Sequence, residues 1–242
     1  MVPVRYLGLD AADDATGTVV VIDVLRAFTT AAFAFAAGAQ RITVVSTVTE
    51  ALGLREENPD WLIMGEEDGL PVDGFDFDNS PSALIGRDLT GCRLIQRTSA
   101  GTQGVVRSRR ATHLFAASLT CAQATVRAIL TLGSDQVTMV ITGSDADGWG
   151  DEDLACADYL KALIHGEVPD DERAIERVLR SKAAEKFRDP QRPQFAPTDL
   201  DCAVDVDRFA FALPLQWQGA YPVMKPAFAE DSQRKAGSDG AP

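Results

Sequence analysis

The chain has 242 residues, 45% of them hydrophobic and 24% charged, with a formal net charge of −13. This length and hydrophobic content suffice for the core of a soluble globular protein, with one domain as the default. The acidic balance and the lack of a Lys/Arg stripe exclude a general nucleic-acid-binding surface. An anionic ligand would therefore need a local basic pocket.

The four cysteines form no C-x-x-C pair and have no histidine at metal-binding spacing, so neither a zinc site nor a disulfide framework is indicated. The N-terminus shows no basic segment followed by an apolar one, and no apolar stretch reaches about 18 residues. We therefore expect a cytoplasmic protein with reduced thiols and no membrane partner.

Short apolar runs rich in β-branched residues alternate with helical stretches along the chain. Such runs are typical of strands buried on both faces, and the alternation predicts an α/β fold with a mostly parallel sheet. The expected strands are Val19 to Ile22, Ile42 to Val45, Trp61 to Met64, Leu94 to Ile95, His113 to Ala116 and Val137 to Ile141. The expected helices are Arg26 to Ala37, Val48 to Glu57, Ser82 to Ile85, Thr102 to Ser108, Leu119 to Leu132 and Asp151 to Ile164.

The last third of the chain has a different composition. We expect one charged helix over Asp171 to Arg188, then a proline-rich loop over Asp189 to Pro197 that forms a lid or an excursion from the sheet. Phe209 to Leu213 and Tyr221 to Met224 are expected to add late strands. Residues 231–242 have the composition of a disordered tail, so residues 1–230 are assigned to a single domain.

Ligands of open parallel sheets bind beyond the carboxyl ends of the strands, which directs attention to the residues that follow each strand. Asp23 and Arg26 follow the first expected strand. Asp23 could ligate a cation or attack phosphorus, and Arg26 could hold an anion with its planar guanidinium. The plainer alternative is that Asp23 caps the next helix.

An acidic segment follows the third expected strand and includes Glu66, Asp76, Asn79 and Ser80. A buried carboxylate must be paired, hydrogen-bonded or bound to a metal, and Mg2+ favours one or two carboxylates together with water and substrate oxygens. The alternative is a solvated acidic loop. The Asp-x-Asp spacing at Asp76 also imitates the nucleophile motif of haloacid-dehalogenase-like phosphatases, but no buried apolar strand precedes it.

Two further helix starts carry candidate residues. The turn Arg97-Thr98-Ser99-Ala100-Gly101-Thr102 opens a helix, and its free N–H groups with Arg97 could cradle a phosphate or sulfonate. Helix capping is the alternative for this turn. Glu152 and Asp153 stand in a first helical turn, where the helix dipole favours acidic residues without any catalysis.

Taken in order, these segments resemble the 2-phosphosulfolactate phosphatase family. The matching pieces are Val21-Ile22-Asp23-Val24-Leu25-Arg26-Ala27, Gly65-Glu66, Gly74-Phe75-Asp76 with Asn79-Ser80-Pro81, Arg97-Thr98 through Gly101-Thr102, and Glu152-Asp153 before Cys156-Ala157. The resemblance implies a three-layer α/β/α sandwich and Mg2+-dependent hydrolysis of 2-phospho-3-sulfolactate in coenzyme M biosynthesis. The turn at 98–102 is one residue longer than usual in the family, and Asp78 stands where glycine is usual.

From the resemblance we expect Asp23, Glu66 and Asp76 to supply metal ligands. Arg26, Arg97 and the segment containing Thr98, Ser99, Gly101 and Thr102 would hold the anionic groups, with Asn79 and Ser80 as further substrate-binding residues. Asp23 with Arg26 and Arg97 would form the catalytic set, with Glu152 and Asp153 as secondary candidates.

Several alternatives stay open from the sequence. Attack by Asp23 and attack by metal-bound water both fit the residues. The altered turn and Asp78 leave open a phosphatase for a different phosphorylated 2-hydroxy acid, or a member that binds a metabolite or anion without turnover. Many compact α/β enzymes of this size form homodimers, which the sequence does not decide.

Overall fold

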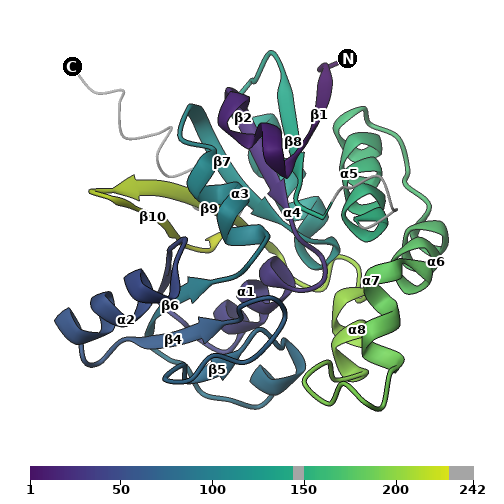
Figure 1. Cartoon of the computed structure of the whole chain (residues 1–242). Coiled ribbons are helices and arrows are strands. Elements are labelled where there is room, and N and C mark those ends of the chain that lie inside the picture. Colours follow the sequence, from purple (N-terminus) through teal and green to yellow (C-terminus); the bar gives the residue numbers. More distant parts are fainter. Residues whose placement is uncertain (144–149, 229–242) are drawn as a thin grey trace, which may run out of the picture.

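An 11-stranded mixed sheet forms the centre of the computed structural model, which describes residues 1–143 and 150–228 (Figure 1). The expected tail at residues 231–242 lies outside these ranges. The strands are β1 Val4–Gly8, β2 Gly17–Ile22, β3 Arg41–Val44, β4 Leu62–Gly65, β5 Phe77–Asp78, β6 Arg93–Arg97, β7 Ala111–Ala117, β8 Val137–Ile141, β9 Phe211–Gln218, β10 Tyr221–Met224 and β11 Ala227–Phe228. The helices are α1 Ala27–Ala36, α2 Val48–Glu57, α3 Gly101–Arg107, α4 Ala122–Thr131, α5 Asp151–Ile164, α6 Asp171–Arg180, α7 Lys182–Glu185 and α8 Thr198–Ala203. Short 3-10 turns are η1 Leu9–Asp14, η2 Ser82–Leu84, η3 Leu119–Cys121 and η4 Lys186–Arg188.

The sheet consists of two parallel halves separated by an antiparallel hairpin. Its strand order is β1-β8-β2-β7-β9-β10-β3-β6-β4-β5, with β11 beside β9. Strands β1, β8, β2 and β7 are parallel, and so are β3, β6, β4 and β5. The hairpin β9–β10 is antiparallel to the neighbour on each side. The expected α/β fold with a mostly parallel, mixed sheet is confirmed.

The inserted hairpin reverses the direction of one half relative to the other. In a flat sheet, the carboxyl ends of β2 and β6 would then lie on opposite edges. The sheet instead curls, and the ends of β2, β4 and β6 converge near the start of α1 (Figure 1). The side-chain amide of Gln96, in β6, donates to the carbonyl of Ala27 at 2.8 Å and ties the two halves together there.

Both faces of β2 are buried, as its uninterrupted apolar run predicted. Val19 and Val21 join the core that includes α1 and Val105 of α3, whereas Val20 and Ile22 join the core of α4 and α5. Helices on both faces of the sheet produce the sandwich. A third, smaller core packs α2 against the outer face of β4 and β6 through Ala51, Ile63 and Ile95, among others.

The C-terminal third differs from the single helix expected over residues 171–188. The helix α6 ends at Arg180 because Ser181 adopts an extended conformation (ψ 152°) and caps α7, accepting a hydrogen bond from Ala184 N at 3.2 Å. The chain continues through η4 to α8, which the sequence pattern did not predict. In the described ranges, no helix combines the length and apolar character needed to cross a membrane.

Candidate active site

Asp23 stands between the end of β2 and the start of α1. Its side chain is almost fully buried, at 6% exposure, and Oδ1 accepts a hydrogen bond from Ala27 N at 2.9 Å. Asp23 therefore accepts a hydrogen bond from the first N–H group of α1, as the capping alternative proposed, although the N-cap position itself is occupied by Arg26. Asp23 is also buried beside other carboxylates and so belongs to a charged cluster. The helix-capping role and a role in a charged site are therefore compatible.

The start of α3 packs directly against Asp23. A Cβ placed on Gly101 would lie 2.7 Å from Asp23 Oδ2 and 2.7 Å from Ala27 Cβ. The Gly101 N–H group also hydrogen-bonds Asp23 and favours its charged form. Glycine is thus required at this position because the first turn of α3 and the Asp23 carboxylate are in close contact.

The hydroxyls of Thr98 and Thr102 are used within this turn. Thr98 N donates to Thr102 Oγ1 at 2.8 Å, Thr102 N donates to Thr98 Oγ1 at 3.1 Å, and Thr102 Oγ1 donates to Thr98 O at 2.7 Å. Both side chains are fully buried. The capping alternative therefore holds for these hydroxyls, and the expectation that these two side chains contact substrate is not supported.

Glu66 follows β4 and fixes the position of Ser99. Its carboxylate is buried and accepts hydrogen bonds from Ser99 N at 2.6 Å, Ser99 Oγ at 3.1 Å and Gly69 N. The close approach of β4 and β6 depends on Gly65, because a Cβ there would lie 1.8 Å from the carbonyl oxygen of Arg97. The ends of the two strands are thereby held together.

Arg97 braces the same turn. Its Nη1 donates to Glu66 O at 2.6 Å and Ser99 Oγ at 3.1 Å, while its Nη2 lies 2.9 Å from a carboxylate oxygen of Glu67. These contacts support Glu66 and Ser99. The structure thus assigns Arg97 a supporting role in the turn and gives no contact between its guanidinium and Asp23.

Asp76 does not join Asp23 and Glu66. Both of its carboxylate oxygens accept hydrogen bonds from Arg55 of α2, at 2.7 to 3.0 Å, and Oδ2 also accepts from Ile63 N at 2.7 Å. Ile63 lies near the start of β4, whereas Glu66 lies beyond its end. Asp76 instead forms a partly exposed ion pair that anchors the loop to α2, an arrangement that does not support the expectation that it is a metal ligand.

Two carboxylates from the start of α5 complete the acidic side of the site. Asp153 accepts hydrogen bonds from Val24 N at 2.7 Å, Thr142 Oγ1 at 3.1 Å and Gly143 N at 3.2 Å, which ties α5 to the segment after β2. Glu152 is also buried, but its Oε2 atom has no hydrogen-bond partner in the described structure. A buried carboxylate oxygen without a partner indicates an available ligand position.

The carboxylates raise one another's pKa. Burial raises the pKa of Asp23 to about 6, and the charge of Glu66 adds to this, while the N–H groups of Ala27 and Gly101 and the charge of Arg26 oppose it. Burial, with the charge of Asp23, raises the pKa of Glu152 to about 7. Burial and the charges of Glu152 and Asp23 raise the pKa of Asp153 well above its ordinary value. The site thus concentrates negative charge that a cation would stabilise.

Arg26 provides a buried positive charge beside this cluster. Its Nη1 donates to Asp199 Oδ2 at 2.8 Å and to Gln194 O at 3.1 Å. The guanidinium carbon also lies 4.9 Å from the ring centre of Phe195 and 5.3 Å from that of Phe187, within cation–π range. The segment from η4 to α8 therefore surrounds Arg26.

Lys186 of η4 is a second cation at this place. Its Nζ atom lies 5.7 Å from the centre of the same Phe195 ring. Burial lowers its pKa, while the charges of Glu152 and Glu66 raise it and those of Arg192 and Arg26 lower it. Lys186 is thus electrostatically coupled to both the acidic and the basic side of the site.

Asn79 and Ser80 lie on the side of Arg26. Ser80 Oγ donates to Asp199 Oδ1 at 2.8 Å, and Asp199 in turn binds Arg26. Asn79 is buried, and its Oδ1 atom has no hydrogen-bond partner in the described structure. The structure therefore brings Asp23, Glu66, Glu152, Asp153, Arg26, Ser99, Gly101 and Ser80 into one connected site.

The donor set fits a cation that takes few protein ligands. Among the described residues, no three His, Cys, Asp or Glu side chains form a complete metal-binding cluster. Mg2+ usually keeps several waters and binds one or two carboxylates plus substrate phosphate oxygens. Asp23 and the unpartnered Oε2 of Glu152 suit that coordination, whereas both oxygens of Glu66 are already engaged by Ser99 and Gly69.

The model of a family described as 2-phosphosulpholactate phosphatase matches residues 8–194. The chain belongs to this family. It is 36% identical over 207 residues to the probable 2-phosphosulfolactate phosphatase of Bacillus subtilis, covering 85% of this chain and 90% of that protein. It is 38% identical over 157 residues to the corresponding Deinococcus radiodurans protein, covering 63% and 65%, and 40% identical over 146 residues to that of Carboxydothermus hydrogenoformans, covering 60% of each.

Membership of the 2-phosphosulfolactate phosphatase family confirms the resemblance inferred from the sequence motifs. Sequence reasoning missed two site residues, Lys186 and Asp199. The sequence pattern placed Lys186 in an exposed charged helix, and it predicted no helix or strand at Asp199. The available signal was the Pro-rich loop before Asp199, because a loop of that length in an α/β domain often covers a site.

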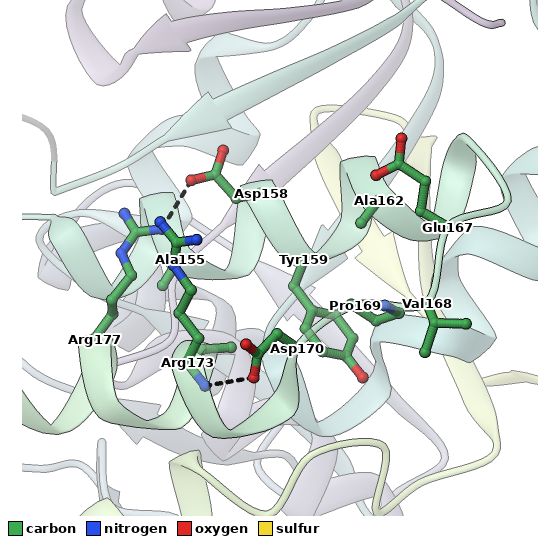
Figure 2. A pocket seen from close by; sticks show the side chains of 11 residues that line it. Ala155, Asp158, Tyr159, Ala162, Glu167, Val168, Pro169, Asp170, Arg173 and Arg177 are labelled. Carbon is green, nitrogen blue, oxygen red and sulfur yellow. Dashed lines mark hydrogen bonds and ion pairs between the residues drawn. The ribbon is translucent and has the colours of Figure 1, made fainter.

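A separate pocket of about 330 Å³ lies between α5 and α6 (Figure 2). Asp158 and Arg177 form an ion pair at 2.8 Å on its wall, and Tyr159 donates to Asp171 at 2.8 Å beside it. None of the residues assigned to the site above lines this pocket. The pocket therefore has the character of a groove between two helices that an ion pair joins.

Proposed function

We propose that the protein is a Mg2+-dependent phosphatase that hydrolyses a small acidic phosphomonoester such as 2-phospho-3-sulfolactate to sulfolactate and phosphate. The observation that carries this proposal is the proximity of opposite charges: buried Asp23 and Glu152 on one side, and buried Arg26, whose charge acts on Asp23, on the other. Phosphoryl transfer depends mainly on positioning and on neutralising phosphoryl charge, which such a site can supply.

Asp23 and Glu152 would hold the Mg2+ ion, which supplies positive charge opposite the phosphoryl oxygens. Glu66 would keep the Ser99 turn in place through its hydrogen bonds to Ser99. Arg26 would bind phosphoryl oxygens with the donors that its contacts with Asp199 and Gln194 leave unused. Burial under Phe187 and Phe195 would exclude water from this guanidinium and strengthen its attraction for anions.

Two routes account for cleavage of the phosphate ester. In the first route, Asp23 attacks phosphorus, the P–O bond to the alcohol breaks and the leaving oxygen gains a proton; water then hydrolyses the aspartyl phosphate to the free carboxylate and phosphate and loses a proton. Alternatively, water attacks phosphorus directly and loses a proton while the alcohol gains one. A single turnover in 18O-labelled water that places label in the Asp23 carboxylate would eliminate direct attack by water, whereas label in phosphate fits both routes because water can attack the phosphorus of an aspartyl phosphate. The configuration at a chiral, isotopically labelled phosphoryl group separates the remaining cases: two displacements at phosphorus retain it, and inversion would refute attack by Asp23 followed by attack of water at phosphorus.

Lys186 would bind the second acidic group of the substrate. Its coupling to Glu152, Glu66 and Arg26 supports this role. Substitution Lys186→Met should raise KM for 2-phospho-3-sulfolactate at least tenfold but change KM for 2-phospholactate, which lacks the sulfonate, less than twofold. Equal changes for both substrates would remove Lys186 from recognition of the sulfonate.

The proposal is tested by phosphate release from a panel of phosphorylated 2-hydroxy acids, with Mg2+ and with EDTA. We expect release that requires Mg2+ and falls at least 1,000-fold in Asp23→Asn, a loss typical of a missing metal ligand or nucleophile. Asp158→Asn, which removes a carboxylate from an Arg–Asp pair outside the site, is the matched control. Absence of release from every substrate at any divalent-ion concentration would favour a member that binds its ligand without turnover.

A further inference from the structure

Asp199 connects three segments that are far apart in the sequence. It belongs to α8, and its side chain is fully buried. Oδ2 pairs with Arg26 Nη1 at 2.8 Å. Oδ1 accepts hydrogen bonds from Ser80 Oγ at 2.8 Å, Ser82 Oγ at 2.6 Å and Ser82 N at 3.0 Å. Both carboxylate oxygens are therefore committed within the protein.

The contacts around Arg26 determine the orientation of its guanidinium group. Arginine has five N–H donors in a planar group, and the bonds to Asp199 and Gln194 both use Nη1. The donors on Nη2 and Nε are not used by these two bonds. Because the plane is rigid, fixing Nη1 on one side sets where the remaining donors point.

Stability alone does not account for such a buried pair. Removing two charges from water costs about as much as their mutual attraction returns, so a buried ion pair is weak evidence for a stabilising role. Asp199 also links Arg26 to Ser80, which lies in the Asn79-Ser80-Pro81 motif. The contacts of Asp199 therefore fix the positions of Arg26 and Ser80 relative to each other.

We propose that Asp199 is a positioning residue that aims the Arg26 guanidinium at the phosphoryl group and holds Ser80 in the same frame. Asp199 lies outside residues 8–194, the segment that the family model matches. A residue beyond the matched segment thus controls a residue of the first motif. This inference rests on the proposed role of Arg26 in binding phosphate.

A double-mutant cycle with Asp199→Asn and Arg26→Gln tests the inference. The readouts are kcat/KM, the inhibition constant of inorganic phosphate, and the rise in Tm that phosphate produces in the protein without substrate. We expect each single variant to lower kcat/KM at least tenfold and to weaken phosphate inhibition by a similar factor. The double variant should be no worse than Arg26→Gln, because Asp199 acts through Arg26.

Asp199→Glu is a second variant that keeps the inference testable if Asp199→Asn does not fold. It keeps the charge but moves the carboxylate, so we expect a Tm near that of the parent with weakened phosphate inhibition. Asp158→Asn is the control, since it removes one Arg–Asp contact on α5 and should leave all three readouts unchanged. Ordinary phosphate affinity in folded Asp199→Asn or Asp199→Glu would overturn the inference, and so would losses that multiply in the double variant.

The phosphate-induced Tm shift separates this inference from the proposed function. If the parent binds phosphate without turning over any substrate, the proposed function fails, and loss of the shift in Asp199→Asn still supports positioning. If the parent turns over substrate but Asp199→Asn keeps its phosphate affinity, only the positioning role fails. A parent that shows no phosphate-induced shift would overturn the inference directly.

Discussion

Substitution of Asp23 by asparagine should make the metal-free protein more stable at high pH. The pKa of Asp23 rises from 3.8 to about 6 in the folded protein, and one pKa unit corresponds to about 1.4 kcal/mol. The ionised carboxylate therefore disfavours the folded state by about 3 kcal/mol above about pH 7. Asparagine can still accept the hydrogen bond from Ala27 N, so the cap is retained.

The sign of the pH dependence follows from the raised pKa. Between about pH 4 and about pH 6 the folded protein binds a proton that the unfolded chain has lost, so stability falls as the pH rises through this range. Glu152, whose pKa rises to about 7, extends the fall to higher pH. Asp23→Asn removes one part of this loss and also removes the charge that raises the pKa of Glu152.

Urea unfolding in EDTA at about pH 5 and about pH 8 measures the effect. We expect the parent to lose stability between these values and Asp23→Asn to lose about 1.4 kcal/mol less, because only about one pH unit of the Asp23 titration, from about pH 5 to its pKa of about 6, falls in this range. Asp76→Asn is the matched control, because its carboxylate is paired with Arg55 away from the cluster, and it should keep the parent's pH dependence. A parental pH dependence in Asp23→Asn would refute the view that ionised Asp23 destabilises the folded protein. Addition of Mg2+ at about pH 8 should stabilise the parent and not Asp23→Asn.

Two further substitutions test the geometry. Gly101→Ala places a Cβ 2.7 Å from Asp23 Oδ2. We expect a loss of about 100-fold in kcat with a small change in Tm, because displacing a reacting group by about 1 Å costs this much. Full activity would show that the contact relaxes without moving Asp23. Asp78 is exposed in β5, so Asp78→Gly should change kcat and KM by less than about twofold, as usual for surface positions; a tenfold change in KM would instead make Asp78 a determinant of substrate choice.

The sequence predicted the sheet well because burial on both faces leaves a clear signal. The runs at residues 19–22 and 137–141 are apolar except for Thr138, and they correspond to β2 and β8 with little adjustment. The sequence could not predict that the β9–β10 hairpin separates two parallel halves running in opposite directions. Strand pairing depends on contacts between distant segments, which local patterns do not encode.

The same limit explains which site residues were predicted. Asp23 and Glu66 follow strands directly, so the rule that ligands bind beyond strand ends was enough to find them. Asp76 directly precedes β5, but its hydrogen bond with Ile63 near the start of β4 and its pairing with Arg55 could be seen only in three dimensions. Thr98 and Thr102 have the residue types of an anion-binding turn and use them to hold the turn together.

The acidic and basic sides of the site depend on different parts of the chain. The carboxylates of Asp23, Glu66 and Glu152 come from segments that the family model matches, and two of them follow strands of the sheet. Arg26 shares a motif with Asp23, but its orientation depends on Asp199 and on the rings of Phe187 and Phe195. Changes between residues 186 and 199 can therefore alter how the anion is held without changing any carboxylate of the cluster. Within this fold, substrate preference should follow the C-terminal segment more closely than it follows the motifs.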